Sequence, residues 1–272
     1  MLTDAHVPSP EVDAELLIGH VLGLTRGQVQ AKAMTDAGVG PDDTVAVVEV
    51  VERRAVREPL QHITGRAAFR SLDLAVGPGV FVPRPETETV AQLAIDALMA
   101  VASPSPLGVD LGTGSGAIAL ALATEVPHAR IVAVENSPRA FPWTKQNARD
   151  VGADNLRLVF ADLADAVPEL DGTVDVVVSN PPYIPLGAVP RDAEVRLHDP
   201  EHALYGGPDG LDVVRAVSTR ALSLLRPGGT LVLEHGDEQA AAIRELLTAA
   251  GWHAPVTTRD LLARDRATSA TR

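Results

Sequence analysis

Short apolar runs alternate with stretches of helical periodicity through the C-terminal two thirds of the chain. The runs that predict strands lie at 107–111, 130–134, 156–161, 174–179, 229–235 and 267–271. Between them, helices are predicted at 138–151, 211–225 and 238–250. Parallel strands need long crossover connections, which helices usually supply, so this alternation is typical of parallel sheets. We therefore expect an α/β fold built on a doubly wound, mostly parallel sheet.

A glycine-rich turn, VDLGTGSG at 109–116, joins the first of these strands to an apolar helical stretch. Glycines let the backbone approach a ligand closely, and the helix that follows carries partial positive charge at its N-terminus. The spacing is Gly-x-Gly-x-Gly, which differs from the Gly-x-Gly-x-x-Gly pattern of dinucleotide-binding folds. The turn therefore favours the amino acid part of S-adenosylmethionine over a pyrophosphate.

Acidic residues follow the next two predicted strands. Glu135 ends the strand at 130–134, where a carboxylate can accept hydrogen bonds from both hydroxyls of a ribose. Asp162 ends the strand at 156–161 and is expected to face the adenine amino group. With the glycine turn, the two carboxylates predict an S-adenosylmethionine site along one edge of the sheet.

The tetrapeptide Asn180-Pro181-Pro182-Tyr183 follows the apolar strand at 174–179. Two prolines cannot continue a sheet ladder, so they end the strand and stiffen the loop at the edge where such sheets bind ligands. The loop offers an amide, carbonyls and an aromatic ring, which together can hold a planar amide or amino group. This predicts methyl transfer to a weakly nucleophilic nitrogen. The plainer alternative is a proline-terminated loop with a packed tyrosine.

The rest of the chain predicts three domains. Residues 1–60 show helical periodicity at 10–22, 25–34 and 41–57, which indicates a small helical domain, expected to dock the substrate. Glycines and prolines divide residues 61–85 into short alternating stretches, which predict a β-hairpin linker. Residues 86–272 form the catalytic domain, beginning with a helix at 89–101. The long segment at 185–210 is interpreted as a lid that faces the substrate.

Composition excludes several other classes of protein. A net charge of −13 argues against a broad nucleic-acid surface, which needs basic residues to displace counterions. The chain has no cysteine, hence no disulfide, thiolate metal site or nucleophile for cytosine-C5 methylation, and we expect no metal. No run of 18 apolar residues predicts a membrane span, and the start of the chain lacks a signal segment. We expect a cytoplasmic enzyme.

Motifs spread over the whole chain resemble those of the HemK/PrmC protein-(glutamine N5) methyltransferases. Besides the glycine turn and the tetrapeptide, the matching runs are PEVDAELL at 10–17, PLQHITG at 59–65, FVPRPETE at 81–88, ALYGGPDGLD at 203–212 and EHGDEQ at 234–239. The tetrapeptide alone is shared with amino-group methyltransferases of DNA and RNA. The PRPETE and GGPDGLD runs are far more specific.

The resemblance implies a class I S-adenosylmethionine-dependent methyltransferase whose product is S-adenosyl-L-homocysteine. Its implied partners are class I peptide-chain release factors, with the glutamine of their Gly-Gly-Gln motif as substrate. By this analogy Asn180 and the Pro181 carbonyl hold the glutamine amide, Pro182 lines the site and Tyr183 packs on the amide. Arg84 and Glu86 would shape the entrance. The implied cofactor residues are Gly112, Thr113, Gly114, Ser115, Gly116, Glu135, Asp162, Leu163 and Asn180.

The sequence departs from the family pattern at two places and leaves three alternative functions open. Leu163 stands where an aromatic side chain often packs on the adenine, and the run at 262–266 lacks the usual glycine. An adenine-N6 methyltransferase acting on DNA or RNA shares the chemistry, but the acidic charge disfavours it. A non-catalytic adenosine- or nucleotide-binding regulator is disfavoured by the intact tetrapeptide, and a dehydrogenase by the glycine spacing.

Overall fold

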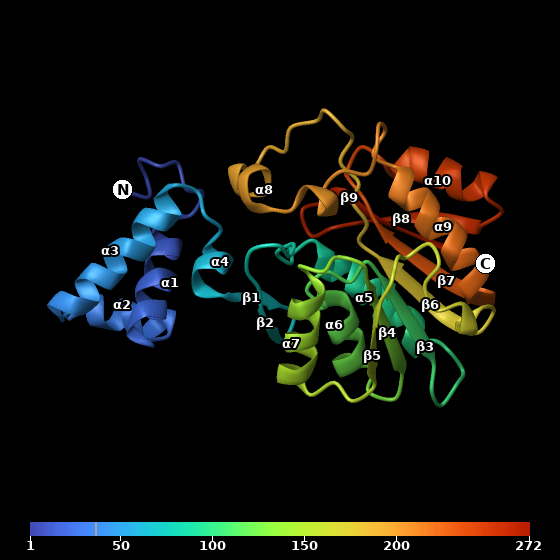
Figure 1. Ribbon diagram of the computed structural model, residues 1–272, viewed down its shortest axis with the longest axis horizontal. Coiled ribbons are helices and arrows are strands. Elements are labelled where there is room, and N and C mark those ends of the chain that lie inside the picture. The colour runs from blue at the N-terminus through green and yellow to red at the C-terminus, as the bar shows by residue number, and fades with distance from the viewer. Residues whose placement is uncertain (36) are drawn as a thin grey trace. The chain divides into compact units, whose positions relative to one another are not determined.

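The computed structural model describes residues 1–35 and 37–272, which divide into two compact units (Figure 1). The smaller, helical unit contains Met1–Arg66 and also Pro190–Asp199, a segment from much later in the chain. The larger, sheet unit contains Ala67–Val189 and Pro200–Arg272. The helical unit thus extends to Arg66, six residues beyond the predicted domain at 1–60. The docking role of that domain stays a prediction.

The larger unit is built on a seven-stranded sheet of order β5-β4-β3-β6-β7-β9-β8. Strands β3 to β7 pair with one another in parallel, whereas β9 runs antiparallel to both β7 and β8. The predicted doubly wound, mostly parallel sheet is thus confirmed. The strands are β3 (Leu107–Leu111), β4 (Arg130–Glu135), β5 (Leu156–Phe160), β6 (Val174–Ser179), β7 (Leu225–Glu234), β8 (His253–Arg259) and β9 (Asp265–Thr271).

The central strands β3 and β6 are buried at every position, which explains their almost continuous apolar sequences. They pair with each other, while β4 and β5 lie to one side and β7, β9 and β8 to the other. The strand order therefore reverses between β3 and β6. Ligands of doubly wound sheets bind at the carboxyl ends of the strands at such a point.

Helices cover both faces of the sheet (Figure 1). Apolar residues of α5 and α6, joined by the C-terminal part of α7, pack on one face, and those of α9 and α10 pack on the other. Helix α6 is apolar all round because it is buried along most of its length. The helices are α5 (Thr87–Met99), α6 (Ala117–Glu125), α7 (Phe141–Val151), α9 (Asp212–Leu224) and α10 (Ala240–Ala249).

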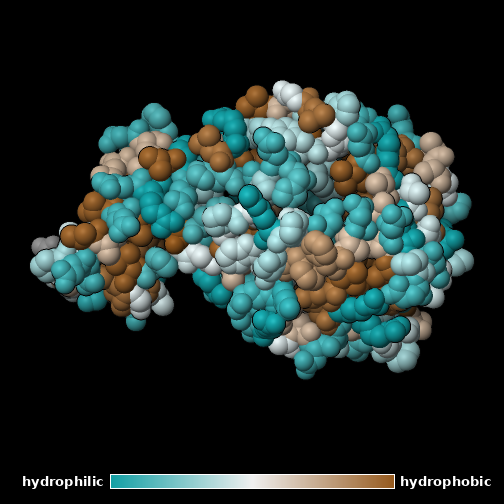
Figure 2. Space-filling view, viewed as in Figure 1, coloured by the Kyte–Doolittle hydropathy of each residue, from teal (hydrophilic) through white to brown (hydrophobic). Residues whose placement is uncertain are grey.

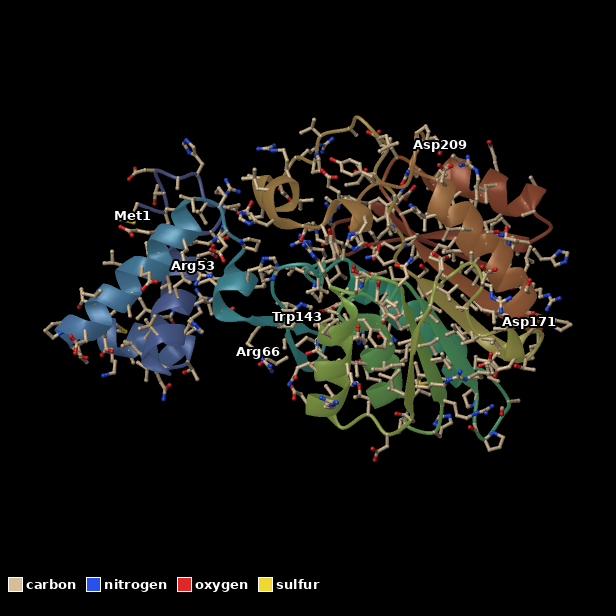
Figure 3. The ribbon with its side chains drawn as sticks, in the orientation of Figure 1. Met1, Arg53, Arg66, Trp143, Asp171 and Asp209 are labelled. Atoms are coloured by element: carbon tan, nitrogen blue, oxygen red, sulfur yellow. The ribbon has the colours of Figure 1, made fainter. Side chains whose placement is uncertain are left out.

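A two-stranded hairpin, β1 (Arg66–Phe69) and β2 (Leu72–Ala75), lies within the predicted linker. One of the short alternating stretches of this linker, at 80–82, belongs to no strand, although Val80 and Val82 are buried in a small apolar cluster. Trp143 of α7 packs against this cluster (Figure 3). A Cβ on Gly77 would lie 2.7 Å from the Trp143 ring, so the close approach requires glycine there.

Sequence patterns located most elements but not all. Strand β8 was not predicted, because it contains Pro255 and is the antiparallel edge strand, where proline is tolerated. Strand β7 begins at Leu225 rather than 229, with Pro227 and two glycines in its first half. Helix α5 begins at Thr87, two residues before the predicted start.

The helical unit consists of α1 (Pro10–Leu22), α2 (Arg26–Met34), α3 (Pro41–Ala55), α4 (Leu60–Thr64) and α8 (Ala193–His198). Helix α1 ends at Gly23, whose φ of 63° is left-handed, and α2 begins with a capping box between Thr25 and Gln28. Its small core contains Leu2, Val7, Leu17 and Ile63. The segment interpreted as a lid therefore carries elements of its own: α8, and the turn η2 (Glu201–Ala203) in the larger unit.

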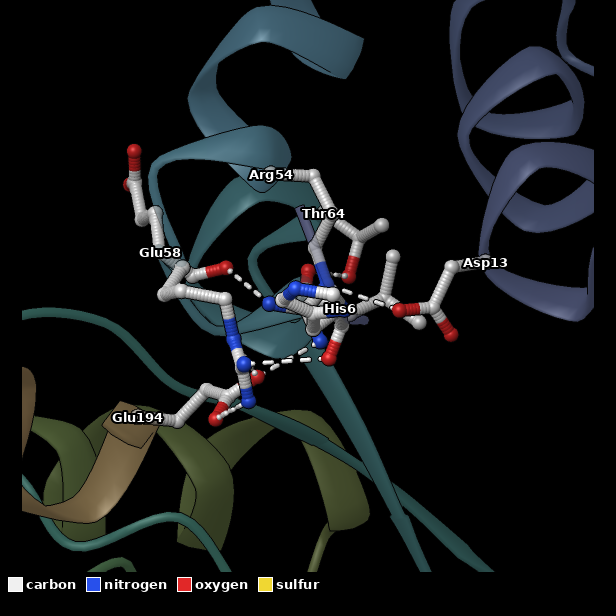
Figure 4. A network of polar contacts seen from close by, with 8 residues as sticks. His6, Asp13, Arg54, Glu58, Thr64 and Glu194 are labelled. Atoms are coloured by element: carbon white, nitrogen blue, oxygen red, sulfur yellow. Dashed lines mark hydrogen bonds and ion pairs between the residues drawn. The ribbon is translucent and has the colours of Figure 1, made fainter. Parts of the chain in front are cut away.

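A network of charged side chains ties α8 into the helical unit (Figure 4). Arg54 of α3 donates to Asp13 of α1 at 2.7 Å and to Glu194 of α8 at 2.8 Å. Arg57 donates to the other oxygen of Glu194 at 2.5 Å. Burial alone would raise the pKa of Glu194, but the hydrogen bonds from Arg57 and Arg54 outweigh it and lower the pKa to about 2.

Candidate active site

The glycine turn after β3 takes a conformation that other residues rarely adopt. Gly112, Gly114 and Gly116 have φ values of 75°, 60° and 87°. A Cβ on Gly112 or Gly114 would meet nothing within 4 Å, so the backbone there faces open space. A Cβ on Gly116 would lie 3.1 Å from Thr144, because the turn packs against α7 at that point. The turn is a cradle that a ligand can approach closely.

Asp110, near the end of β3, stabilises the turn through hydrogen bonds. Its Oδ2 accepts hydrogen bonds from the Thr113 hydroxyl at 2.6 Å and from the Ala119 backbone N–H at 3.1 Å. Its Oδ1 makes no hydrogen bond within the described part of the chain. Burial raises the pKa of Asp110 to about 7. The sequence placed Asp110 in the motif without assigning it this supporting role.

Two polar residues of α7 also fix the turn, and sequence reasoning missed both. The Thr144 hydroxyl donates to the Gly114 carbonyl at 2.6 Å. The Asn147 amide donates to the Ser115 carbonyl at 2.8 Å and accepts from the Ala75 N–H at 2.7 Å. Both side chains are buried. In the sequence, the feature that could have identified them was their spacing of three positions, which places them on the same face of α7.

Glu135 lies at the carboxyl end of β4, beside the glycine turn. One carboxylate oxygen accepts from the Gly114 N–H at 2.8 Å and the other from the Ser137 N–H at 2.7 Å. Each oxygen retains a lone pair, because an ionised carboxyl group has about four acceptor positions. The residue therefore orders the turn and can accept ligand hydroxyls as well.

Asp162 and Leu163 follow β5, next to Glu135 along the edge of the sheet. Asp162 is exposed, and its two oxygens accept from the Asn136 amide at 3.1 Å and the Ala164 N–H at 2.9 Å. Leu163 is half-buried and packs against the core below the sheet edge. Both stay predicted cofactor residues.

The Asn180–Tyr183 loop leaves β6 directly beside the glycine turn. Ser179, the last residue of β6, donates to the Leu111 carbonyl at 2.6 Å, which joins the ends of the two central strands. Pro181 is buried, and Asn180 and Tyr183 are half-buried. The Asn180 Nδ2 donates to the Thr87 hydroxyl at 3.4 Å. The loop and the turn, 68 residues apart in the sequence, thus lie side by side at one edge of the sheet.

The run at 203–212 packs against the back of this loop. The Gly206 N–H donates to the Ile184 carbonyl at 2.9 Å, and the Ile184 N–H donates to the Leu204 carbonyl at 2.9 Å. A Cβ on Gly206 would lie 2.4 Å from the Pro182 carbonyl oxygen, and one on Gly210 2.3 Å from that of Tyr183. The glycines of the GGPDG run are therefore required by close backbone packing.

Glu234 is a buried carboxyl group close to the loop, and it was not predicted as a site residue. It ends β7, and its Oε2 has no hydrogen-bond partner within the described residues. Burial raises the pKa of Glu234 to about 7, against hydrogen bonds from the hydroxyls of Thr87 and Tyr183 and the charge of Arg266. Burial likewise raises the pKa of Tyr183. In the sequence, the feature that could have identified Glu234 was its position at the end of β7, the strand next to β6.

Arg84 and Glu86 precede α5. The Arg84 guanidinium lies over the Phe81 ring, 5.0 Å from its centroid. Glu86 is half-buried, and its negative charge contributes to the raised pKa of Glu234 and of Tyr183. Glu86 therefore lies in the electrostatic surroundings of the loop, and the entrance role of both residues stays a prediction.

Over residues 1–35 and 37–272, no helix is both long and apolar enough to cross a membrane. The same residues contain no group of three or more histidine, cysteine, aspartate or glutamate side chains that could hold a metal ion.

The sheet order, the glycine turn and the adjoining loop define a class I methyltransferase. A methyltransferase from Pyrococcus furiosus shares this fold, with a TM-score of 0.54 and 19% identity over 81% of this chain and 97% of that chain. Models of the methyltransferase small domain and the PrmC N-terminal domain match residues 61–197 and 1–65. The release factor glutamine methyltransferase of Streptomyces coelicolor is 50% identical over 92% of this chain and 87% of that protein. The chain belongs to the release factor glutamine methyltransferase family, as its motifs predicted.

One relative carries a different name. The 4-amino-L-phenylalanine/4-methylamino-L-phenylalanine methyltransferase of Streptomyces pristinaespiralis is 45% identical over 204 residues, 74% of this chain and 69% of that protein. Its name describes methylation of an amino group on an aromatic ring.

Proposed function

We propose that the protein transfers a methyl group from S-adenosylmethionine to the side-chain amide nitrogen of the Gly-Gly-Gln glutamine in class I release factors. The observation that carries the proposal is the junction of β3 and β6, where Ser179 bonds to the Leu111 carbonyl. That junction brings the glycine turn and the Asn180–Tyr183 loop together at one sheet edge. A methyl donor held by the turn would lie next to an acceptor held by the loop. The proposed substrate implies a cytoplasmic enzyme.

The residues at the turn fit S-adenosylmethionine. Open space faces Gly112 and Gly114, and Glu135 and Asp162 follow in order along neighbouring strands. The turn would hold the amino acid part, Glu135 the ribose hydroxyls and Asp162 the adenine. Thr113, Ser115, Gly116 and Leu163 would complete this site. The sulfonium group supplies a methyl that is already activated, so no residue needs to act as a nucleophile.

The chain's own contribution is to position the amide and to raise its nucleophilicity. An amide nitrogen is a poor nucleophile because its lone pair is delocalised. The Asn180 Oδ1 and the Pro181 carbonyl would each accept one N–H of the glutamine amide and stabilise the positive charge that develops during transfer. Pro182 and Tyr183 would confine the amide plane. Neither acceptor needs to change its own protonation state, because the methylated nitrogen would lose one N–H proton to water after transfer, leaving S-adenosyl-L-homocysteine as the other product.

Recognition of an intact release factor requires more surface than one glutamine provides, because specific interfaces bury roughly 1,200–2,000 Å² in total. Arg84 and Glu86 would guide the Gly-Gly-Gln segment. The helical unit would add contact area, since Val45 and Val48 of α3 are 69% and 43% exposed. Figure 2 shows such hydrophobic residues on the surface of this unit. Docking of the substrate is thus its proposed role.

The test is methylation by the purified enzyme with isotope-labelled S-adenosylmethionine. The acceptors are an intact class I release factor, the same factor with alanine in place of the motif glutamine, duplex DNA and 4-aminophenylalanine. We expect label only on the unaltered factor. Label on the alanine form or on DNA would overturn the proposed substrate. Preferred labelling of 4-aminophenylalanine would instead assign the activity of the Streptomyces pristinaespiralis relative.

A further inference from the structure

We propose that Gln239 is a positioning residue for methyl transfer, because its side-chain amide holds the backbone of the Asn180–Tyr183 loop in place. Gln239 immediately precedes α10 and is the last residue of the EHGDEQ run at 234–239. It belongs to the larger unit, as the loop does. It acts on the loop rather than on the substrate. The inference deepens the proposed function and rests on it.

The loop has few backbone groups of its own with which to fix its position. Pro181 and Pro182 have no N–H, so neither can donate a hydrogen bond to a neighbouring strand. The sheet pairing of β6 with β7 extends to Ser179. Beyond the loop, the Ile184 N–H donates to the Leu204 carbonyl at 2.9 Å. Between these two points, a side chain that bonds to a loop carbonyl can stabilise the backbone.

Gln239 supplies such a bond. Its Nε2 donates to the Tyr183 carbonyl at 2.9 Å, although the two residues are 56 positions apart in the sequence. Its Oε1 accepts from the Gly236 N–H at 3.0 Å. A backbone N–H only donates and a carbonyl only accepts. The two partners together therefore fix which end of the Gln239 amide faces the loop.

Close packing surrounds this bond. A Cβ on Gly210 would lie 2.3 Å from the Tyr183 carbonyl oxygen and 2.9 Å from the Gln239 Nε2. A Cβ on Gly236 would lie 3.1 Å from the Gln239 Oε1 and 3.8 Å from Cδ2 of the Tyr183 ring. Glycine at both positions therefore leaves room for the amide of Gln239. The turn at 236–239 adjoins the ring of Tyr183 as well as its carbonyl.

This arrangement bears on the transfer step. In the proposed function, Asn180 and the Pro181 carbonyl accept the N–H groups of the glutamine amide, and Tyr183 packs on that amide. A shift of the Tyr183 carbonyl would move the neighbouring peptide units, because the prolines between Asn180 and Tyr183 make the loop stiff. Displacing reacting groups by about 1 Å can cost ~10² in rate. Loss of the Gln239 bond should therefore slow transfer without affecting the glycine turn.

The main test compares two variants of Gln239 that differ in one bond. Gln239→Met keeps the length of the side chain and loses both hydrogen bonds. Gln239→Glu keeps an acceptor for the Gly236 N–H, but an ionised carboxylate has no hydrogen to give to the Tyr183 carbonyl. We expect both variants to lower the single-turnover methylation rate of an intact release factor roughly 10-fold, the effect of one lost hydrogen bond. The affinity for S-adenosylmethionine, measured by calorimetry, should stay unchanged.

Gln146→Met is the matched control, because Gln146 is exposed on α7 and bonds to Asp150 of the same helix. Its rate should equal that of the wild type. A wild-type rate for Gln239→Glu alone would overturn the inference, because it would confine Gln239 to the turn before α10. Wild-type rates for both Gln239 variants, with Asn180→Ala impaired, would overturn it as well.

A double-mutant cycle shows whether Gln239 acts through the loop. Gln239→Met should cost less in an Asn180→Ala background than in the wild type, and an equal loss in both would overturn the inference. A wild-type rate for Asn180→Ala itself would overturn the proposed role of the loop instead. Hydrogen exchange then tests the inference without the reaction. Exchange of the Ile184 N–H should speed up in Gln239→Glu but not in Gln146→Met, and unchanged exchange would overturn the inference.

Gly236→Ala gives an independent test should the Gln239 variants not fold. It keeps every hydrogen-bonding group, but the added Cβ would crowd the Gln239 Oε1 at 3.1 Å. We expect a smaller fall in the single-turnover rate, again with unchanged affinity for S-adenosylmethionine. A wild-type rate, or a fall that follows weaker cofactor binding, would overturn the inference.

Discussion

Arg54 and Glu194 lie 140 positions apart in the sequence, yet they form an ion pair of 2.8 Å inside the helical unit. Arg54 is 5% exposed and also bonds to Asp13, so α8 is bound to both α1 and α3 through one side chain. Pro190–Asp199, which contains α8, is therefore anchored to the N-terminal part of the chain.

Replacing Glu194 should release this segment. Glu194→Ala removes the shared acceptor of Arg54 and Arg57, and hydrogen bonds to charged groups contribute about 1.5–3 kcal/mol each. Hydrogen exchange should speed up across Pro190–Asp199 while β3 and β6 remain protected. Arg215→Ala is a suitable control, because its pairs with Asp209 and Asp212 are exposed. Unchanged exchange at 190–199 would show that the ion pairs do not hold α8.

The same ion pairs predict sensitivity to acid. The folded pKa of Glu194 is about 2, below its ordinary value of 4.5, so the unfolded chain binds more protons between these values. The contribution of Glu194 to stability is complete above about pH 4.5 and is lost as the pH falls toward 2. Protection of Pro190–Asp199 should decline over this window in the wild type. In Glu194→Ala the decline should be smaller, and an equal decline would assign it to other groups.

Glu135→Ala should weaken binding of S-adenosylmethionine far more than binding of the release factor. The substitution would lose two ribose contacts at about 1.5–3 kcal/mol each, and it also frees the Gly114 N–H. Calorimetry with each ligand measures the difference. Glu135→Gln should lie between wild type and alanine, since it keeps one acceptor. An unchanged cofactor affinity in the alanine variant would place Glu135 outside the site.

The exposed valines of α3 provide a test of docking. Val45→Asp together with Val48→Asp should raise the KM for an intact release factor, because both positions are exposed and would carry charge into an apolar contact. Methylation of a short Gly-Gly-Gln peptide and cofactor affinity should not change. Leu262→Asp, at an exposed position of the larger unit, is the control. An unchanged KM would leave α3 without a role in recognition.

The sequence was sufficient to predict the parts of the fold that local patterns encode. The apolar runs of β3 and β6 predicted a parallel sheet. The turn at Gly112, Gly114 and Gly116 was recognisable because its positive φ values require glycines. The motifs also identified the family before the fold was known. Strand β8 was missed because Pro255 masks its alternation.

What the sequence could not show were pairings between distant polar residues. The contact of Thr87 with Asn180 carried no separate signal, because Thr87 has an ordinary structural explanation as a helix start. The ion pair between Arg54 and Glu194 could not be predicted either, since charged residues at distant positions in a sequence do not indicate which of them are in contact. These relationships depend on the strand order and on the packing of α8, which only the folded chain defines.

In the proposed function, Asn180 accepts a hydrogen bond from the glutamine amide during methyl transfer. The most direct measurement is the single-turnover rate at which the motif glutamine of an intact release factor gains a methyl group, followed by mass spectrometry, for wild type and Asn180→Ala. We expect Asn180→Ala to lower this rate by ~10²–10³, as for other preorganised acceptors and donors, with cofactor affinity nearly intact by calorimetry. A rate within a few-fold of wild type would contradict it.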